Sequence, residues 1–269
     1  MKYSKGNITV ELTAFLILWF LGTIVYLRVL SIVFTEVYGV YAVPYWLLLI
    51  IVFSKLYNVK LKELGFKYEV KDSWITIFYP VILGSFLPLT IGLFGTMFNV
   101  VEFNLLEKIS LSEITYTFIV YFIWAFGEEA IFRGYIFHRI LMQGYNVKYA
   151  IFVNAILFTL VHALNIGFNV VAFFQLLIGG ILLSLLVLSS GSLVSPTLFH
   201  SMWNYMLTLL GFPVSGNTRY ILLKASTKNF EFIFGGSFGP EGGLAGLAVI
   251  ILGLYITMTL FKHKEIFKT

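Results

Sequence analysis

The sequence predicts an all-α, polytopic membrane protein with about eight transmembrane helices. Two observations support this fold class. Of the 269 residues, 59% are hydrophobic and 12% are charged, whereas soluble domains average about 25% charged residues. The hydrophobic residues also occur in long runs, and a helix needs about 20 mostly apolar residues to cross the hydrocarbon core of a bilayer.

Eight apolar runs are long enough to cross a bilayer. They predict spans at residues 10–33, 38–54, 74–98, 111–137, 147–164, 169–189, 193–210 and 242–261. The first run is too long for the apolar core of a signal peptide and lacks a small-residue cleavage site, so it is expected to remain as a helix. Residues 211–243 contain many glycines and prolines and are predicted to form an irregular outer loop. With no repeat and no low-complexity segment, residues 1–269 are predicted to form one transmembrane domain, with its motif core at about 111–210.

Charge distribution predicts the orientation and excludes some partners. With a cytoplasmic N-terminus, thirteen of the eighteen Lys and Arg residues fall on the inner side: Lys2, Lys5, Lys55, Lys60, Lys62, Lys67, Lys71, Arg133, Arg139, Lys148, Lys262, Lys264 and Lys268. The positive-inside rule therefore predicts that both termini are cytoplasmic. The basic residues are scattered through loops, so the net charge of +5 does not indicate a nucleic-acid partner. The absence of cysteine excludes disulfides, thiolate metal ligands and a cysteine nucleophile.

Three short polar clusters interrupt the predicted spans. They are Glu128, Glu129 and Arg133; Phe158 and His162; and His200 and Asn204. An ionisable side chain at membrane depth costs about 2.5–3.5 kcal/mol on translocon scales, and such residues usually mark a functional site. We therefore expect the helices to enclose an active-site cavity within the membrane.

The spacing within the clusters suggests separate roles. Glu128 and Glu129 point about 100° apart on a helix and cannot share the same neighbours. Glu129 and Arg133 are spaced i,i+4, which favours an ion pair and leaves Glu128 as the free carboxylate and candidate general base. His200 and Asn204 have the same spacing, so both can donate hydrogen bonds to an oxyanion.

Helix rise gives a first estimate of depth for the three clusters. From the predicted helix ends, Glu128 lies about 14 Å and His200 about 10 Å from the cytoplasmic side, whereas His162 lies about 22 Å from it. On this estimate, His162 is too deep to share a site unless its helix is tilted or begins later. Phe158, one turn earlier, is expected to pack beside His162.

In this order on successive spans, the clusters resemble the three motifs of the CAAX protease and bacteriocin-processing (CPBP, or Abi) family, which includes the type II CAAX prenyl endopeptidases. The patterns Glu-Glu-x-x-x-Arg, Phe-x-x-x-His and His-x-x-x-Asn match without substitution, and Gly-Ser-Leu-x-x-Pro at residues 191–196 also fits. The matching stretch, at about residues 120–205, covers about a third of the chain.

The resemblance implies hydrolysis of a peptide bond within the membrane. Glu128 and His162 would activate a water, while His200 and Asn204 would hold the oxyanion. Glu129, Arg133 and Phe158 would support these residues. In the prenyl-processing branch, the substrate is a lipidated C-terminal Cys-a-a-X sequence that loses its last three residues. The expected partners are thus a lipidated peptide or protein, entering from the cytoplasm, and membrane lipids.

Three alternatives remain open from the sequence. A zinc-dependent protease of the same family could act on another membrane substrate such as a bacteriocin precursor, with ligands supplied by Glu128, His162, His200 and Asn204. We favour no cofactor, because there is no His-Glu-x-x-His pair and an amide is a poor zinc ligand. A proton-coupled transporter could use the same carboxylates and histidines as a relay. The clusters could also form ion pairs and hydrogen bonds that only fasten helices together.

Overall fold

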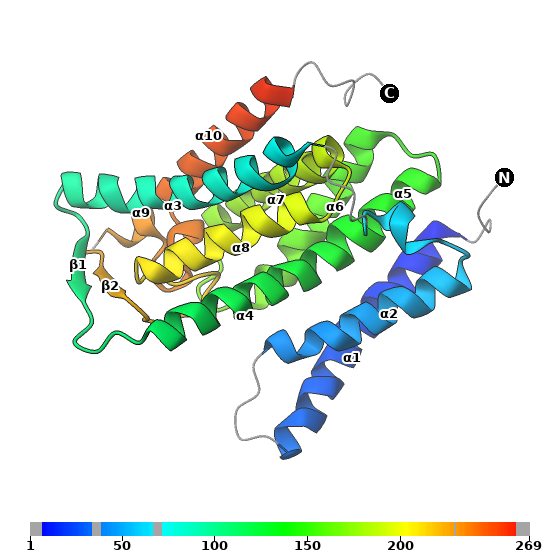
Figure 1. Cartoon of the computed structure of the whole chain (residues 1–269), viewed down its shortest axis with the longest axis horizontal. Coiled ribbons are helices and arrows are strands. Elements are labelled where there is room, and N and C mark those ends of the chain that lie inside the picture. Colours follow the sequence, from blue (N-terminus) through cyan, green and yellow to red (C-terminus); the bar gives the residue numbers. More distant parts are fainter. Residues whose placement is uncertain (1–6, 34–38, 67–71, 229, 262–269) are drawn as a thin grey trace.

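The computed structural model describes residues 7–33, 39–66, 72–228 and 230–261, which form a bundle of helices (Figure 1). The α-helices are α1 (Ile8–Val33), α2 (Val43–Leu56), α3 (Tyr79–Met97), α4 (Leu111–Glu129), α5 (His138–Met142), α6 (Val147–Val161), α7 (Val170–Ser190), α8 (Val194–Leu209), α9 (Glu231–Phe234) and α10 (Leu244–Phe261). Two π-helical segments are η3 (Trp74–Phe78) and η4 (Ala130–Phe137). Short 3-10 turns are η1 (Gly39–Ala42), η2 (Leu61–Leu64), η5 (His162–Leu164), η6 (Gly236–Phe238) and η7 (Pro240–Gly242).

Seven helical segments of the described chain are long and apolar enough to cross a membrane. They are Ile8–Ile32, Gly39–Leu56, Trp74–Met97, Leu111–Met142, Val147–Leu164, Val170–Ser190 and Leu244–Phe261. These segments confirm seven of the eight predicted spans and the all-α, polytopic fold class. The chain is therefore an integral membrane protein.

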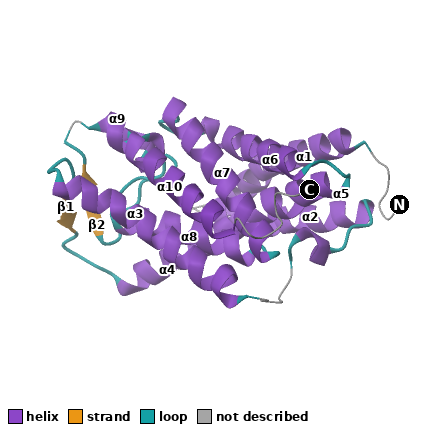
Figure 2. Ribbon diagram, turned by 90° about the horizontal axis from the view of Figure 1, so that it is seen from above, coloured by secondary structure: helices purple, strands orange, loops and turns teal. Residues whose placement is uncertain are grey.

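The remaining predicted span, 193–210, forms the shorter helix α8. Its 16 residues extend only about 24 Å, which is less than the roughly 30 Å thickness of the hydrocarbon core. Helix α8 packs against α3, α4 and α7 and lies among them in both views (Figures 1 and 2). Because its neighbours shield it from lipid, α8 tolerates a shorter length and more polar residues than an outer span.

Helices α4 and α5 are joined without a break by the π-helical segment η4. All eight residues of η4 are buried, and π-helical turns occur frequently at functional sites. The helical run therefore continues to Met142, whereas the sequence predicted an end at residue 137. This extension changes the depth of the residues on α4, as described below.

A buried ion pair fastens α1 to the rest of the bundle. Arg139 contacts the carboxylate of Glu11 through Nε and Nη2, each at 2.5 Å, and the Tyr135 hydroxyl donates to the same carboxylate at 2.6 Å. The side chains of Glu11 and Arg139 are fully buried. The assignment of Arg139 to a cytoplasmic loop was wrong, because this arginine points into the bundle.

The segment predicted as an irregular loop, 211–243, folds back over one end of the bundle. Its strand β2 (Leu223–Ser226) pairs antiparallel with β1 (Glu102–Leu105). The buried carboxylate of Glu241 accepts hydrogen bonds from the Trp203 indole at 3.0 Å and from the backbone and hydroxyl of Ser215 at 2.6 and 2.7 Å. Glu241 thereby anchors this segment to α8.

We expect Glu11→Gln to destabilise the protein strongly, because it leaves the Arg139 guanidinium buried without its carboxylate partner. Breaking a buried ion pair from one side costs about 3–5 kcal/mol. Thermal unfolding of the detergent-solubilised protein, followed by circular dichroism, measures this loss.

The matched control is Glu102→Gln, which removes the exposed pair between Glu102 and Lys228 at 3.5 Å. An exposed pair contributes about 0–1 kcal/mol, so this variant should unfold close to the wild-type temperature. Equal decreases in unfolding temperature for the two variants would show that the Glu11–Arg139 pair contributes no more to stability than an exposed ion pair.

Candidate active site

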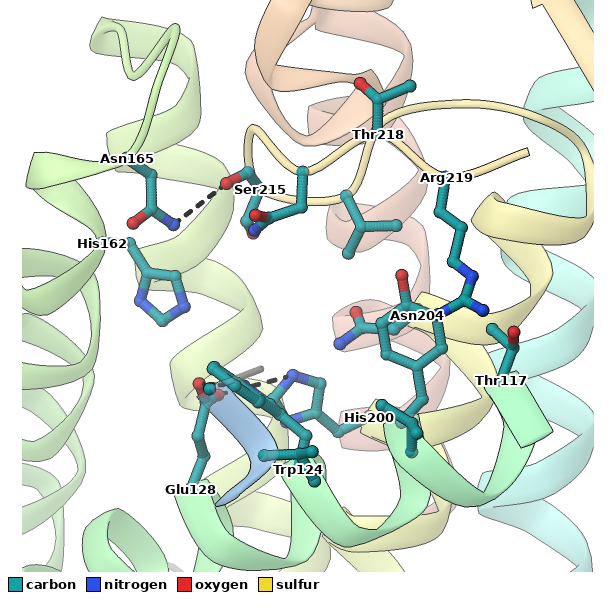
Figure 3. A pocket seen from close by; sticks show the side chains of 16 residues that line it. Thr117, Trp124, Glu128, His162, Asn165, His200, Asn204, Ser215, Thr218 and Arg219 are labelled. Carbon is teal, nitrogen blue, oxygen red and sulfur yellow. Dashed lines mark hydrogen bonds and ion pairs between the residues drawn. The ribbon is translucent and has the colours of Figure 1, made fainter. Parts of the chain in front are cut away.

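The three predicted clusters converge on one cavity of about 340 Å³ between α4, η5, α8 and the segment 214–219 (Figure 3). All four predicted catalytic residues line it. The other lining residues are Gly39, Val40, Thr117, Val120, Tyr121, Trp124, Asn165, Val214, Ser215, Asn217, Thr218 and Arg219. The cavity volume lies within the usual range for ligand pockets, about 300–1,000 Å³.

The depth mismatch expected between His162 and the other clusters is absent for two reasons. The helical run of α4 ends at Met142 instead of residue 137, and α8 begins deep in the bundle instead of at its surface. With the helical run ending at Met142, Glu128 lies about 21 Å from that end, close to the 22 Å estimated for His162. Helix α8 begins deep in the bundle, where Leu193 lies beside Gly134 of η4. Gly134 is about 12 Å from Met142, and His200 lies about 10 Å beyond Leu193 along α8, so it reaches a similar depth.

Glu129 is the central buried anion of the site. Its Oε1 accepts hydrogen bonds from Arg133 Nη1 at 3.1 Å and from His200 Nδ1 at 2.9 Å. Arg133 also donates to the Gly180 carbonyl at 3.2 Å and lies 4.3 Å from the centre of the Phe158 ring. The predicted pair of Glu129 and Arg133 is present, and it links α4, α7 and α8.

Glu128 has a partner that the sequence analysis missed. The indole of Trp124 donates to Glu128 Oε1 at 2.6 Å, and His200 Nε2 lies 3.8 Å from Glu128 Oε2. The expectation of a free carboxylate was therefore wrong. Trp124 and Glu128 are spaced i,i+4 on α4, and this spacing would have identified the contact.

A hydrogen bond to the backbone determines which ring nitrogen of His162 carries hydrogen. Its Nδ1 lies 2.7 Å from the Phe158 carbonyl oxygen, which can only accept a hydrogen bond, so Nδ1 carries hydrogen. In the neutral ring, Nε2 is then an acceptor. The imidazole points into the cavity (Figure 3). The Phe158 ring lies 4.7 Å from it, as the sequence predicted.

His200 and Asn204 lie one turn apart on α8 and face the same cavity (Figure 3). The bond from His200 Nδ1 to Glu129 leaves Nε2 as the nitrogen nearer Glu128. Within the described chain, the Asn204 amide has no hydrogen-bond partner. The site therefore combines a carboxylate, an acceptor nitrogen and two potential donors around a space that can hold water and part of a substrate.

The cavity extends from Glu128 toward the N-terminal end of α4. Thr117 and Tyr121 line this part together with Asn217, Thr218 and Arg219, and the exposed Asn217 and Thr218 place the opening here. The Arg219 guanidinium lies over the Tyr116 ring, 5.6 Å from its centre. Arg219 belongs to the segment predicted as an irregular loop, and the sequence predicted no role for it. A loop has no helical repeat from which the direction of a side chain can be predicted.

A zinc site with three protein ligands would draw on Glu128, His162 and His200, which all line the cavity. Among the residues that the structure describes, no three His, Cys, Asp or Glu side chains are arranged to hold a metal ion. Glu129 binds Arg133 and His200, and Nδ1 of each histidine is held by a hydrogen bond, which leaves Nε2 of each ring available. No step proposed below uses a metal.

Comparison with known proteins identifies the region that carries these residues. Residues 110–206 match the family model described as type II CAAX prenyl endopeptidase Rce1-like. A comparison with curated proteins finds no match for the chain. This family implies a peptidase, and the match covers all three polar clusters. Residues 110–206 are thus similar to the Rce1-like type II CAAX prenyl endopeptidases, which is consistent with the CPBP resemblance of the motifs.

Proposed function

We propose that this protein is an intramembrane endopeptidase in which Glu128 and His162 activate a water, while His200 and Asn204 hold the oxyanion. The family match supports a peptidase of the CAAX type. The observation that carries the proposal is that these four side chains, from α4, η5 and α8, line one cavity. Elements distant in sequence bring together a base and oxyanion donors, as water-mediated peptide hydrolysis requires.

The proposed reaction begins with a water between Glu128 and His162. Glu128 takes one proton from the water, His162 Nε2 accepts a hydrogen bond from the other, and the water oxygen attacks the substrate carbonyl carbon. The resulting oxyanion accepts hydrogen bonds from Asn204 and from Nε2 of doubly protonated His200. Glu128 then returns its proton to the leaving nitrogen as the carbon–nitrogen bond breaks. The products are a carboxylic acid, which keeps the second proton of the water, and a free amine; transfer of that proton to the amine gives the carboxylate and the ammonium.

The supporting residues hold these groups in place. Trp124 engages one oxygen of Glu128, which leaves the other for the water. Glu129 fixes the His200 ring through Nδ1, so that Nε2 faces the cavity. Preorganised donors stabilise developing charge more than mobile ones, because they need no reorganisation during the reaction.

For the substrate, we propose a prenylated CAAX-type C-terminus from which the last three residues are removed. The family description supports this substrate class. A cavity of about 340 Å³ suits a few residues of extended peptide, with the lipid left alongside in the bilayer. The alternative of a zinc-dependent protease differs in mechanism, and the alternative of a proton-coupled transporter differs in having no cleaved product.

We expect Glu128→Gln to reduce cleavage of a farnesylated CAAX peptide by about 10²–10⁴-fold, the usual contribution of a general base. Product masses measured after incubation with purified protein check this loss. The matched control is Glu113→Gln, an exposed position in the first turn of the same helix, which should retain full activity.

Full activity of Glu128→Gln would remove Glu128 from the mechanism. Intact peptide with every variant, together with pH-dependent ion flux in vesicles, would identify a transporter instead. The same assay with a strong chelator should show unchanged activity. Loss that zinc restores would establish the metal-dependent alternative.

We expect Glu129→Gln to lower both stability and activity. It leaves Arg133 buried without its carboxylate, which costs about 3–5 kcal/mol, and it releases His200 from its orientation. Glu128→Gln leaves that ion pair intact and should unfold near the wild-type temperature. Thermal unfolding and cleavage rates measured on both variants separate the two roles, and equal unfolding temperatures would contradict them.

The direction of the cavity favours a second candidate substrate. The cavity opens near the N-terminal end of α4, whereas the lysine-bearing turn η2 contacts α5 at the other end of this helical run. With buried Arg133 and Arg139 left out, the thirteen inner basic residues become eleven, against five on the other side. The positive-inside rule then predicts that the opening faces the non-cytoplasmic side of the membrane. A bacteriocin precursor or another exported peptide is accessible on that side, whereas a cytosolic prenylated protein is not.

Single-cysteine labelling in intact cells tests this orientation, because the natural chain contains no cysteine. We expect Asn217→Cys, at the exposed opening, to react with a membrane-impermeant maleimide from outside. Lys148→Cys, exposed at the start of α6, should react only after permeabilisation. The reverse pattern would place the opening in the cytoplasm and favour the prenylated substrate.

A further inference from the structure

We propose that Arg219 binds the C-terminal carboxylate of the peptide substrate, so that the protein recognises the end of a chain rather than an internal sequence. This inference rests on the proposed peptidase function and assigns a specificity-determining residue to the same cavity. Arg219 is half-buried where the cavity opens and is one of its lining residues.

Charge supports this role for Arg219. Arg133 pairs with Glu129 and Arg139 pairs with Glu11. Arg219 has no acidic partner within 4 Å among the residues that the structure describes. The Arg219 guanidinium lies over the face of the Tyr116 ring, 5.6 Å from the ring centre. This cation–π contact orients the guanidinium without neutralising its charge. A planar guanidinium fixed in this way can bind a carboxylate through two parallel hydrogen bonds.

The separation of Tyr116 and Glu128 along α4 leaves room for a short peptide between Arg219 and the proposed base. Tyr116 lies twelve positions before Glu128 on α4, a separation of about 18 Å along the helix. Three extended residues beyond the scissile bond span about 10–11 Å. The attacking water at one end and the guanidinium at the other occupy much of the remainder. Arg219 is therefore placed to bind the terminus of a released tripeptide.

The lining between the two ends is suited to extended backbone. Thr117 on α4 and Thr218 in the opposite segment lie near Arg219 (Figure 3). Tyr121 and Asn217 also line the cavity. These side chains offer both donors and acceptors, so they can bind peptide groups without selecting particular side chains. A free carboxylate at Arg219 would then determine which bond lies next to Glu128.

Binding of two farnesylated CAAX peptides tests the proposal, one with a free C-terminal carboxylate and one with a C-terminal amide. Both are titrated in neutral detergent against Glu128→Gln protein, which prevents turnover. We expect the acid to bind about ten- to a hundredfold more tightly than the amide, as a charge-assisted hydrogen bond contributes. The preference should disappear in Glu128→Gln/Arg219→Gln and persist in part in Glu128→Gln/Arg219→Lys, because lysine keeps the charge without the planar fork.

The matched control is Lys224→Gln on the same background. Lys224 also lies over a tyrosine ring, Tyr220 at 5.6 Å, but it does not line the cavity. This variant should retain the full preference for the acid. Equal binding of acid and amide, a preference that survives Arg219→Gln, or binding of neither peptide would overturn the role of Arg219. Cleavage of both peptides at equal rates by wild-type protein would do so while leaving the peptidase function intact.

Discussion

The site depends on a single carboxylate oxygen, Glu129 Oε1, which binds both Arg133 and His200. A buried ion without a partner costs several kcal/mol, so each of these groups constrains the other two. Because Arg133 also binds the carbonyl of Gly180 on α7, the network fixes three helices relative to one another. The orientation of the His200 ring follows from this network, and with it the position of the nitrogen that faces the cavity.

The polarity of α8 is compatible with the membrane because its neighbours enclose it. Ten of its sixteen residues are buried, among them His200 and Asn204. Polar side chains in lipid are tolerated when they face the bundle interior or a water-filled cavity. A longer and more apolar helix would face lipid more easily, but it could not supply an imidazole and an amide to the same space. The short length of α8 and the presence of the cavity are therefore linked.

Hydropathy predicted the spans well because the thickness of the bilayer restricts their length and composition. The i,i+4 rule predicted the pair of Glu129 and Arg133 and would have predicted Trp124 with Glu128, since both pairs lie within one helix. The pair of Glu11 and Arg139 has no such signal, because 128 positions separate its members. The depths of Glu128 and His200 were misjudged, because they depended on where the helical run of α4 ends and how deep in the bundle α8 begins. Arg219 was missed because a loop residue has no helical register.

The position of Arg219 determines how a substrate would thread the cavity. A peptide that entered C-terminus first through the opening would leave its carboxylate deep, near Glu128, and would carry a negative charge toward two carboxylates.

With the carboxylate at Arg219, the rest of the substrate must extend past Glu128 in the other direction. Gly39 and Val40 of η1 line the cavity beside Trp124, and Gly39 lies so close to the indole that a side chain there would clash. A lipidated residue on the N-terminal side of the scissile bond would then lie toward α1 and α2, whose exposed apolar side chains face the bilayer. The proposed role of Arg219 thus predicts a substrate with a charged terminus at one end and, for a prenylated substrate, a lipid at the other.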